Sequence, residues 1–224
     1  HNSPQSAAIR NLLANRSESE LRAARAALEA LFAGKAVPSD RMSRIALIGL
    51  RGAGKSTLGR RLADSLQLPF VELSRQIETI AGLAINQIHA LSGAAAYRRY
   101  ERRALEVTLQ EFPRAVIATP GGIVSDDETF HLLLSRCYTI WLRARPEEHM
   151  YRVIAQGDLR PMAGNDEAMN DLRRILEGRT PFYAQADTTF DTSGQSVDAA
   201  ANALVQGVRV ARQSAAGEKD RSAP

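Results

Sequence analysis

The stretch Ile45–Thr57 reads IALIGLRGAGKST, and its second part, Gly49–Ser56, has the spacing G-x-x-x-x-G-K-S. This pattern is typical of a loop that surrounds phosphate, because glycines let backbone N–H groups turn toward phosphate oxygens and a helix N-terminus follows. Lys55 is placed to reach the β- and γ-phosphates, and the Ser56 hydroxyl is placed to bind Mg²⁺. The alternative, a glycine-rich turn that binds nothing, is disfavoured by the apolar strand pattern before it and the helical pattern after it. The predicted phosphate-binding residues are Gly49, Gly52, Ala53, Gly54, Lys55, Ser56 and Thr57.

Short apolar runs alternate with amphipathic segments through most of the chain. Runs typical of buried strands occur at 45–50, 70–73, 115–119, 138–142 and 188–191. Helical patterns occur at about 58–66, 75–91, 94–111, 126–135, 146–156, 167–177 and from Ser196 onward. Such alternation predicts one α/β domain over 42–210, a parallel sheet sandwiched by helices. We expect a flexible tail over 211–224.

Residues 1–41 precede this domain and contain one amphipathic pattern. Ser17 and Glu20 have the spacing of a capping box, and apolar residues from Leu21 to Phe32 recur at helical intervals. An apolar stripe needs a partner but does not identify it. This N-terminal helical linker therefore either packs on its own domain or serves as a connector or dimerisation helix.

Composition excludes several classes of protein. The 224 residues are 44% hydrophobic and 24% charged, which is globular composition, and no apolar run is long enough to span a membrane. The 29 basic and 25 acidic residues give a net charge of +4 without a basic block of the kind that binds nucleic acid. The single cysteine excludes an intramolecular disulfide and a cysteine-rich zinc site. No leader pattern follows His1, so we expect a cytoplasmic protein.

Further residues are predicted from their positions alone. Cys137 and Trp141 adjoin or lie in a strand pattern and are expected in the core. Three histidines belong to no motif and are expected at the surface or at helix edges: His89, His131 and His149.

Five further motifs follow the phosphate-loop sequence in a fixed order. They are Phe70–Ser74 (FVELS), Tyr97–Glu101 (YRRYE), Ala118–Ile123 (ATPGGI), Arg160–Pro161 and Arg179–Tyr183 (RTPFY). In this order they resemble the shikimate kinase family of nucleoside-monophosphate-kinase-like P-loop proteins, from about Ile45 to Val210. The resemblance implies a parallel five-stranded sheet between helices.

The resemblance also implies roles for individual residues. Glu72 stands at the metal-side carboxylate and Ser74 at the carboxylate that holds the substrate hydroxyls. Arg98 and Arg179 stand at the clamp for the substrate carboxylate, whereas Arg99 and Arg103 are expected on a solvated face. The substrate loop corresponds to Pro120, Gly121 and Gly122, the lid arginine to Arg160, and the adenine contacts to Arg152 and Ser193–Gln195. In a working kinase the catalytic residues would be Lys55, Glu72 and Arg160.

Two positions depart from the family pattern. Ser74 offers no base comparable to a carboxylate at neutral pH. Pro120 stands where the family has glycine, and it lacks an N–H and fixes φ. Both changes disfavour phosphorylation of a trihydroxylated acid, yet the two clamp arginines still favour an anionic ligand.

A narrower resemblance accommodates these departures. Ile45–Thr57, Ala118–Gly122 and Ala155–Gly164 look like the shikimate-kinase-like effector domains of helix-turn-helix transcriptional regulators of aromatic degradation. This resemblance implies benzoyl-CoA as effector, a homodimer, and DNA binding through a helix-turn-helix domain absent from this chain. We therefore expect an effector-binding domain rather than an enzyme. The alternatives are an active shikimate kinase that uses ATP and Mg²⁺, or a module that binds ATP without turnover.

Overall fold

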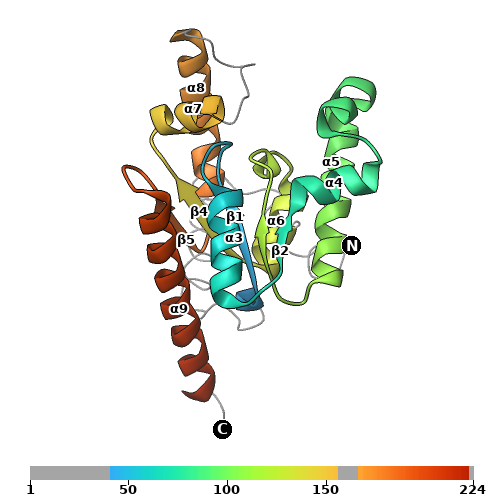
Figure 1. Cartoon of the computed structure of the whole chain (residues 1–224). Helices are drawn as coiled ribbons and strands as arrows, with labels where there is room; N and C mark the ends of the chain where they lie inside the picture. Colours follow the sequence, from blue (N-terminus) through green and yellow to red (C-terminus); the bar gives the residue numbers. More distant parts are fainter. Residues whose placement is uncertain (1–40, 156–165, 222–224) are drawn as a thin grey trace, which may run out of the picture. The chain divides into compact units, whose positions relative to one another are not determined.

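The strand that leads into the phosphate loop lies at the centre of the sheet. The structure is a computed structural model that describes residues 41–155 and 166–221 (Figure 1). The chain divides into two units, 1–38 and 39–224, and the description concerns the second. Five parallel strands pair in the order β2-β3-β1-β4-β5. Their bounds are β1 (Arg44–Ile48), β2 (Phe70–Glu72), β3 (Ala115–Ala118), β4 (Tyr138–Arg143) and β5 (Thr188–Asp191).

The register brings the carboxyl ends of the central strands to one edge of the sheet. Leu47 of β1 pairs with Ala118 of β3, and Ile48 of β1 pairs with Trp141 of β4. The phosphate loop (Gly49–Ser56) follows β1, and the proline–glycine loop (Thr119–Gly122) follows β3. Ligands of open parallel sheets bind at this edge. The predicted α/β fold with five parallel strands is confirmed.

Helices cover the sheet, and two short 3-10 turns occur as separate elements, one before β1 and one between β3 and α6. The helices are α3 (Lys55–Leu66), α4 (Leu73–Ala81), α5 (Ile85–Glu111), α6 (Asp127–Arg136), α7 (Pro146–Ala155), α8 (Asp166–Tyr183) and α9 (Val197–Arg221), and the turns are η1 (Arg41–Ser43) and η2 (Ile123–Ser125). Figure 1 shows α3 and α9 side by side, whereas α4 and α5 lie at the other end of the sheet, near β2. Every residue of β3 is buried, as expected for a parallel strand covered on both faces.

Three helix boundaries differ from the prediction. The expected helix 75–91 is divided, because Gly82 adopts φ 65° and ends α4; α5 then runs from Ile85 through a kink at Gly93. Helix α8 continues to Tyr183, past Pro181, although a proline cannot donate a hydrogen bond to the carbonyl group four residues earlier. Helix α9 continues through Arg221, into the segment 211–224 for which a flexible tail was expected. Helix α9 extends there because the segment is rich in alanine and charged residues of high helix propensity.

The core connects the sheet to the proline–glycine loop. Cys137 and Trp141 are buried, as predicted. The Tyr183 ring is fully buried, stacks on Trp141 with centroids 5.7 Å apart, and its hydroxyl donates to the Gly121 carbonyl oxygen at 2.6 Å. The C-terminal end of α8 is thus fixed to the proline–glycine loop.

One prediction concerns a part of the chain that the structure barely covers. The helical linker over 1–41 lies outside the described residues except for Arg41, which donates to the Cys137 carbonyl oxygen at 2.7 Å. None of the described helices is long and apolar enough to cross a lipid bilayer.

Candidate functional site

The phosphate loop adopts a backbone that residues other than glycine rarely take up, as Gly49 and Gly52 show. Gly49 has φ 136° and Gly52 has φ 78°, both in the region that other residues rarely adopt. A Cβ atom on Gly49 would lie 2.5 Å from the Leu142 carbonyl oxygen, and one on Gly52 would lie 2.7 Å from the His149 carbonyl oxygen. The loop is therefore held between β4 and α7.

Lys55 begins α3 and points back over the phosphate loop. Its Nζ atom donates to the carbonyl oxygens of Gly49 at 2.8 Å and Leu50 at 2.9 Å. Burial lowers the pKa of Lys55 to about 7; the nearby Glu72 carboxylate opposes this shift, and the guanidinium groups of Arg179 and Arg51 add to it. A bound polyphosphate would place negative charge beside this ammonium group and so favour its charged form.

Ser56 and Glu72 bring two oxygen ligands together beside Lys55. The Ser56 hydroxyl donates to the Glu72 carboxylate, and Arg60 donates to the other oxygen of Glu72 at 3.0 Å. Within the described parts of the chain, no group of three or more His, Cys, Asp or Glu side chains forms a metal cage. Mg²⁺ fits this pair nonetheless, since it commonly takes one or two protein oxygens and completes its shell with phosphates and water.

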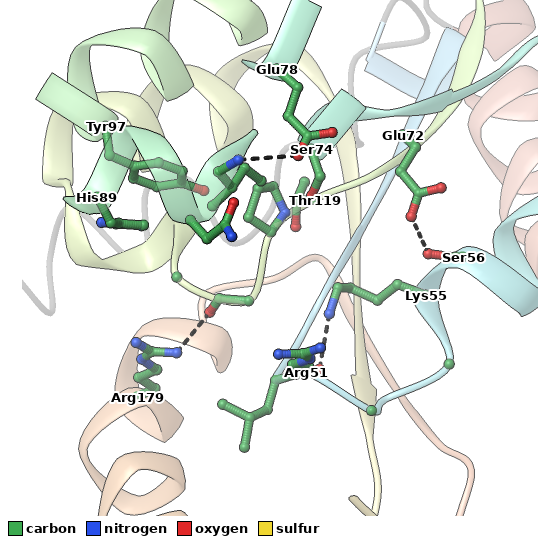
Figure 2. Close-up of a pocket in the computed structure, with 18 of the residues that line it drawn as sticks. Arg51, Lys55, Ser56, Glu72, Ser74, Glu78, His89, Tyr97, Thr119 and Arg179 are labelled. Atoms are coloured by element: carbon green, nitrogen blue, oxygen red, sulfur yellow. Dashed lines mark hydrogen bonds between the residues drawn. The ribbon is translucent and has the colours of Figure 1, made fainter. Parts of the chain in front are cut away.

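A cavity of about 920 Å³ joins the phosphate loop to the other predicted binding residues. This main cavity is within the size range of ligand sites. Figure 2 shows Lys55, Ser56 and Glu72 on one side of it and Arg179, Tyr97 and His89 on the other. The predicted substrate residues in its walls are Ser74, Arg98, Pro120, Gly121, Gly122 and Arg179.

The two clamp arginines converge on the proline–glycine loop. Arg98 donates to the Gly122 carbonyl oxygen at 2.8 Å, and Arg179 donates to the Gly121 carbonyl oxygen at 3.1 Å. A Cβ atom on Gly122 would lie 3.2 Å from Arg98 Nη2, so this glycine admits the guanidinium. Two cations at one cavity wall suit an anionic ligand group.

A buried carboxylate holds Arg98 in place. Glu101 is inaccessible to solvent, forms an ion pair with Arg98 and accepts a hydrogen bond from the Tyr97 hydroxyl at 3.2 Å. Burial raises the pKa of Glu101, while Arg98 and Tyr97 favour its charged form. The neighbours Arg99 and Arg103 are exposed, as predicted.

Several residues near the site were missed by the sequence analysis. Glu78, Asn86 and His89 line the main cavity, and the His89 ring stacks on Tyr97 with centroids 4.4 Å apart. Asn86 and His89 lie three residues apart on α5, and this spacing, which puts them on one helix face, was the available signal for them. The predicted lid residue Arg160 lies outside the described residues.

The expectation for His149 is wrong. Its side chain is 1% exposed, and Nδ1 lies 3.1 Å from the Arg51 carbonyl oxygen in the phosphate loop. Burial lowers its pKa to about 4, so the imidazole is neutral near pH 7. Helix α7 lies against the phosphate loop, and this tertiary contact leaves no trace in the local sequence. His131 is exposed, as predicted.

A second cavity, of about 260 Å³, adjoins the phosphate loop and shares Gly52, Gly54 and Thr57 with the main cavity. Its walls also include Ala53, Leu58, Tyr151, Arg152, Thr192, Gln195, Val197 and Ala200. Arg152 and Gln195 are among the residues expected near an adenine. Ser193 does not line this cavity; its hydroxyl accepts from the Arg145 N–H at 3.1 Å.

Comparison with known proteins gives a consistent result. The family model described as shikimate kinase matches residues 51–209. Shikimate kinase from Caulobacter vibrioides (strain NA1000 / CB15N) is 36% identical over 171 residues, which cover 76% of this chain and 84% of that protein. Shikimate kinase from Paramagnetospirillum magneticum is 34% identical over 171 residues, 76% of this chain and 87% of that protein.

Solved structures agree with these relatives. Shikimate kinase from Acinetobacter baumannii in complex with shikimate has a TM-score of 0.64 and 30% identity over 76% of this chain and 94% of that one. Shikimate kinase from Bacteroides thetaiotaomicron has a TM-score of 0.67 and 29% identity over 74% of this chain and 98% of that one.

These findings overturn the expectation of a benzoyl-CoA-binding effector domain of a transcriptional regulator. The relatives and structural neighbours above are named kinases, and they match over three quarters of this chain. That expectation rested on two replacements, Ser74 and Pro120, whereas the six motifs in order indicated a kinase. On the family model and these identities, the chain belongs to the shikimate kinase family.

Proposed function

We propose that this protein is an ATP-dependent kinase that transfers the γ-phosphoryl group to a hydroxyl of shikimate. One observation carries the proposal: a single cavity holds the phosphate loop with Lys55 on one side and the paired arginines Arg98 and Arg179 on another. Such a cavity can hold a polyphosphate and a carboxylate at the same time. Relatives named shikimate kinase support this choice of substrates.

The phosphate side of the cavity would stabilise the transferring group. The N–H groups of the phosphate loop and the Lys55 ammonium would neutralise charge on the β- and γ-phosphates. Ser56 and Glu72 would hold Mg²⁺, which supplies further charge neutralisation on the phosphate oxygens. Phosphoryl transfer needs little covalent help from the protein, so positioning and charge account for most of the catalysis.

The second cavity would take the nucleotide base. It shares phosphate-loop residues with the main cavity, and Tyr151, Arg152 and Val197 offer aromatic, cationic and apolar surfaces for a planar ring. An ATP molecule would thus contact both cavities, with its phosphates at the loop.

The arginine side would bind the carboxylate of the acceptor. Arg179 and Arg98 keep donors for an anion beyond their bonds to the loop carbonyls, because each guanidinium has five N–H groups. When the arginines fix the carboxylate, the rest of the shikimate ring is oriented toward the phosphate loop. The reacting hydroxyl is then held in place near the γ-phosphate, which lowers the entropic cost of the reaction.

The test is shikimate-dependent release of ADP, measured with the purified chain, ATP and Mg²⁺. Arg179→Ala should raise the KM for shikimate by about 10- to 150-fold, the value of a charge-assisted hydrogen bond, and leave the KM for ATP unchanged. Arg174→Ala on the exposed side of the same helix is the matched control and should behave as wild type. ATP binding without any shikimate-dependent ADP release would overturn the proposal.

A further inference from the structure

The acceptor half of the main cavity lacks a carboxylate at position 74. Transfer to an alcohol requires the hydroxyl to lose its proton as the O–P bond forms, and a carboxylate in hydrogen-bond reach assists this step. The Ser74 hydroxyl can donate and accept hydrogen bonds, but it does not take a proton at neutral pH. A different carboxylate in the cavity could take this proton instead.

Glu78 is placed to supply that group. It lies four residues after Ser74 on α4, so the two side chains occupy the same face of the helix on successive turns, about 6 Å apart at Cβ. Both line the main cavity. Figure 2 shows both side chains projecting from α4 at the end of the pocket away from Arg179, which would hold the acceptor carboxylate.

The other carboxylate in the walls is already engaged. Among the described residues that line the main cavity, the carboxylates are Glu72 and Glu78. Glu72 is bound by Ser56 and Arg60 on the phosphate side. Glu78 Oε1 accepts a hydrogen bond from the Ile85 N–H at 3.1 Å, which leaves Oε2 available for a ligand.

We propose that Glu78 is the acceptor-side carboxylate of this enzyme. Resting on the proposed function, it binds the reacting hydroxyl of shikimate and takes its proton. The hydroxyl oxygen forms a bond to the γ-phosphorus as the bond between that phosphorus and the ADP oxygen breaks, and the proton on Glu78 then passes to solvent. Ser74 donates a hydrogen bond to a neighbouring hydroxyl.

The rival role for Glu78 is purely structural. Its bond to the Ile85 N–H caps the start of α5, and that bond alone would explain a carboxylate at this position. Glu78→Gln separates the two roles, because the amide oxygen still accepts from the Ile85 N–H whereas the negative charge and the proton acceptor are lost. His89, which also lines the cavity, is unchanged in this variant.

Four variants test the assignment by steady-state kinetics with shikimate and ATP. Glu78→Gln should lower kcat by about 100-fold or more, in the range of general base catalysis, with the KM for ATP unchanged. Ser74→Asp in the Glu78→Gln background should restore kcat to within about tenfold of wild type, since it returns a carboxylate to the same helix face. Glu111→Gln, on an exposed carboxylate at the end of α5, is the matched control. Ser74→Asp alone reports whether position 74 accepts aspartate.

Two results would overturn the assignment. If kcat of Glu78→Gln is within twofold of wild type, Glu78 only caps α5. If Ser74→Asp alone is active but does not restore the double variant, Glu78 is needed for something other than a carboxylate at this face.

Failure of the proposed function can be distinguished from failure of the assignment of Glu78. If the wild-type chain releases no ADP with shikimate, calorimetric titration with shikimate decides the contact of Glu78 with the acceptor. Binding weakened tenfold or more by Glu78→Gln, and not by Glu111→Gln, would support that contact. Equal binding, or none in the wild-type chain, would overturn it.

Discussion

Nucleotide binding should draw a proton onto Lys55. In the free protein burial holds the pKa of this ammonium near 7, and its hydrogen bonds go to the uncharged carbonyl groups of Gly49 and Leu50. A polyphosphate brings several negative charges to the same place, which favours the charged form and raises the pKa in the complex toward the usual value for lysine.

The size of the effect follows from that pKa. At pH 8 about one tenth of the free protein carries the proton on Lys55, so binding should take up about 0.9 proton per nucleotide; at pH 6 uptake falls to about 0.1. Because the complex holds more protons than its free components, raising the pH opposes binding. Between pH 7 and the pKa in the complex, Kd should rise by up to about tenfold per pH unit, or about 1.4 kcal/mol.

The assay is titration calorimetry with a non-hydrolysable ATP analogue and Mg²⁺ at pH 8, in buffers of different ionisation enthalpy. Phosphate groups with a second pKa near 6 are fully ionised there and contribute little, and His149, with a pKa of about 4, is neutral throughout. Lys55→Arg is the control, since arginine remains charged and uptake should fall to near zero while binding persists. Uptake below about 0.3 proton in the wild-type protein, or equal uptake in Lys55→Arg, would refute the reasoning.

Three further predictions concern the stability of the fold. Gly52→Ala should destabilise the fold by about 1–3 kcal/mol, because its φ is 78° and the new Cβ would lie 2.7 Å from the His149 carbonyl oxygen; thermal unfolding measures this. Gly207→Ala in α9 meets nothing within 4 Å and should instead stabilise by about 0.5–1 kcal/mol. His149 has a pKa of about 4 in the folded protein, against the ordinary histidine value of 6.5 expected in the unfolded chain. The unfolded chain therefore binds the proton more readily, and stability should fall by on the order of 3 kcal/mol as pH drops from 6.5 to 4. Denaturant titrations at several pH values test this by measuring the free energy of unfolding of wild type and of His149→Gln. An equal pH dependence of this free energy in the two proteins would refute the prediction.

The fold was predictable because its signals are local. Each strand of the sheet is a short apolar run, and the expected strand ranges lie within two residues of the observed ones. The break between α4 and α5 was missed because Gly82 lies within an otherwise continuous helical pattern, and only its positive φ ends the helix. The length of α9 was missed because small and charged residues suit both a helix and a polar tail.

The site was predictable where a motif defines it. Lys55, Arg98 and Arg179 converge on one cavity as the order of motifs indicated. Glu78 and His149 were missed because each owes its place to tertiary packing, of α4 along the cavity and of α7 against the phosphate loop. Ser74 was noted as a departure from the family pattern, but the sequence does not reveal that Glu78, one helical turn beyond it, lines the same cavity.

The shared wall between the two cavities has a consequence for inhibitor design. Gly52, Gly54 and Thr57 line both cavities, so the phosphate-loop backbone alone separates the two cavities at these residues. A compound that joins a flat aromatic group to a carboxylate, with a tether passing along this wall, would engage both spaces at once. The second contact would then form at an effective concentration of millimolar order, and avidity gains of about 10²- to 10⁴-fold need no new contact. Such a compound would be selective against P-loop enzymes that lack paired arginines, because only one of its ends would find a site there.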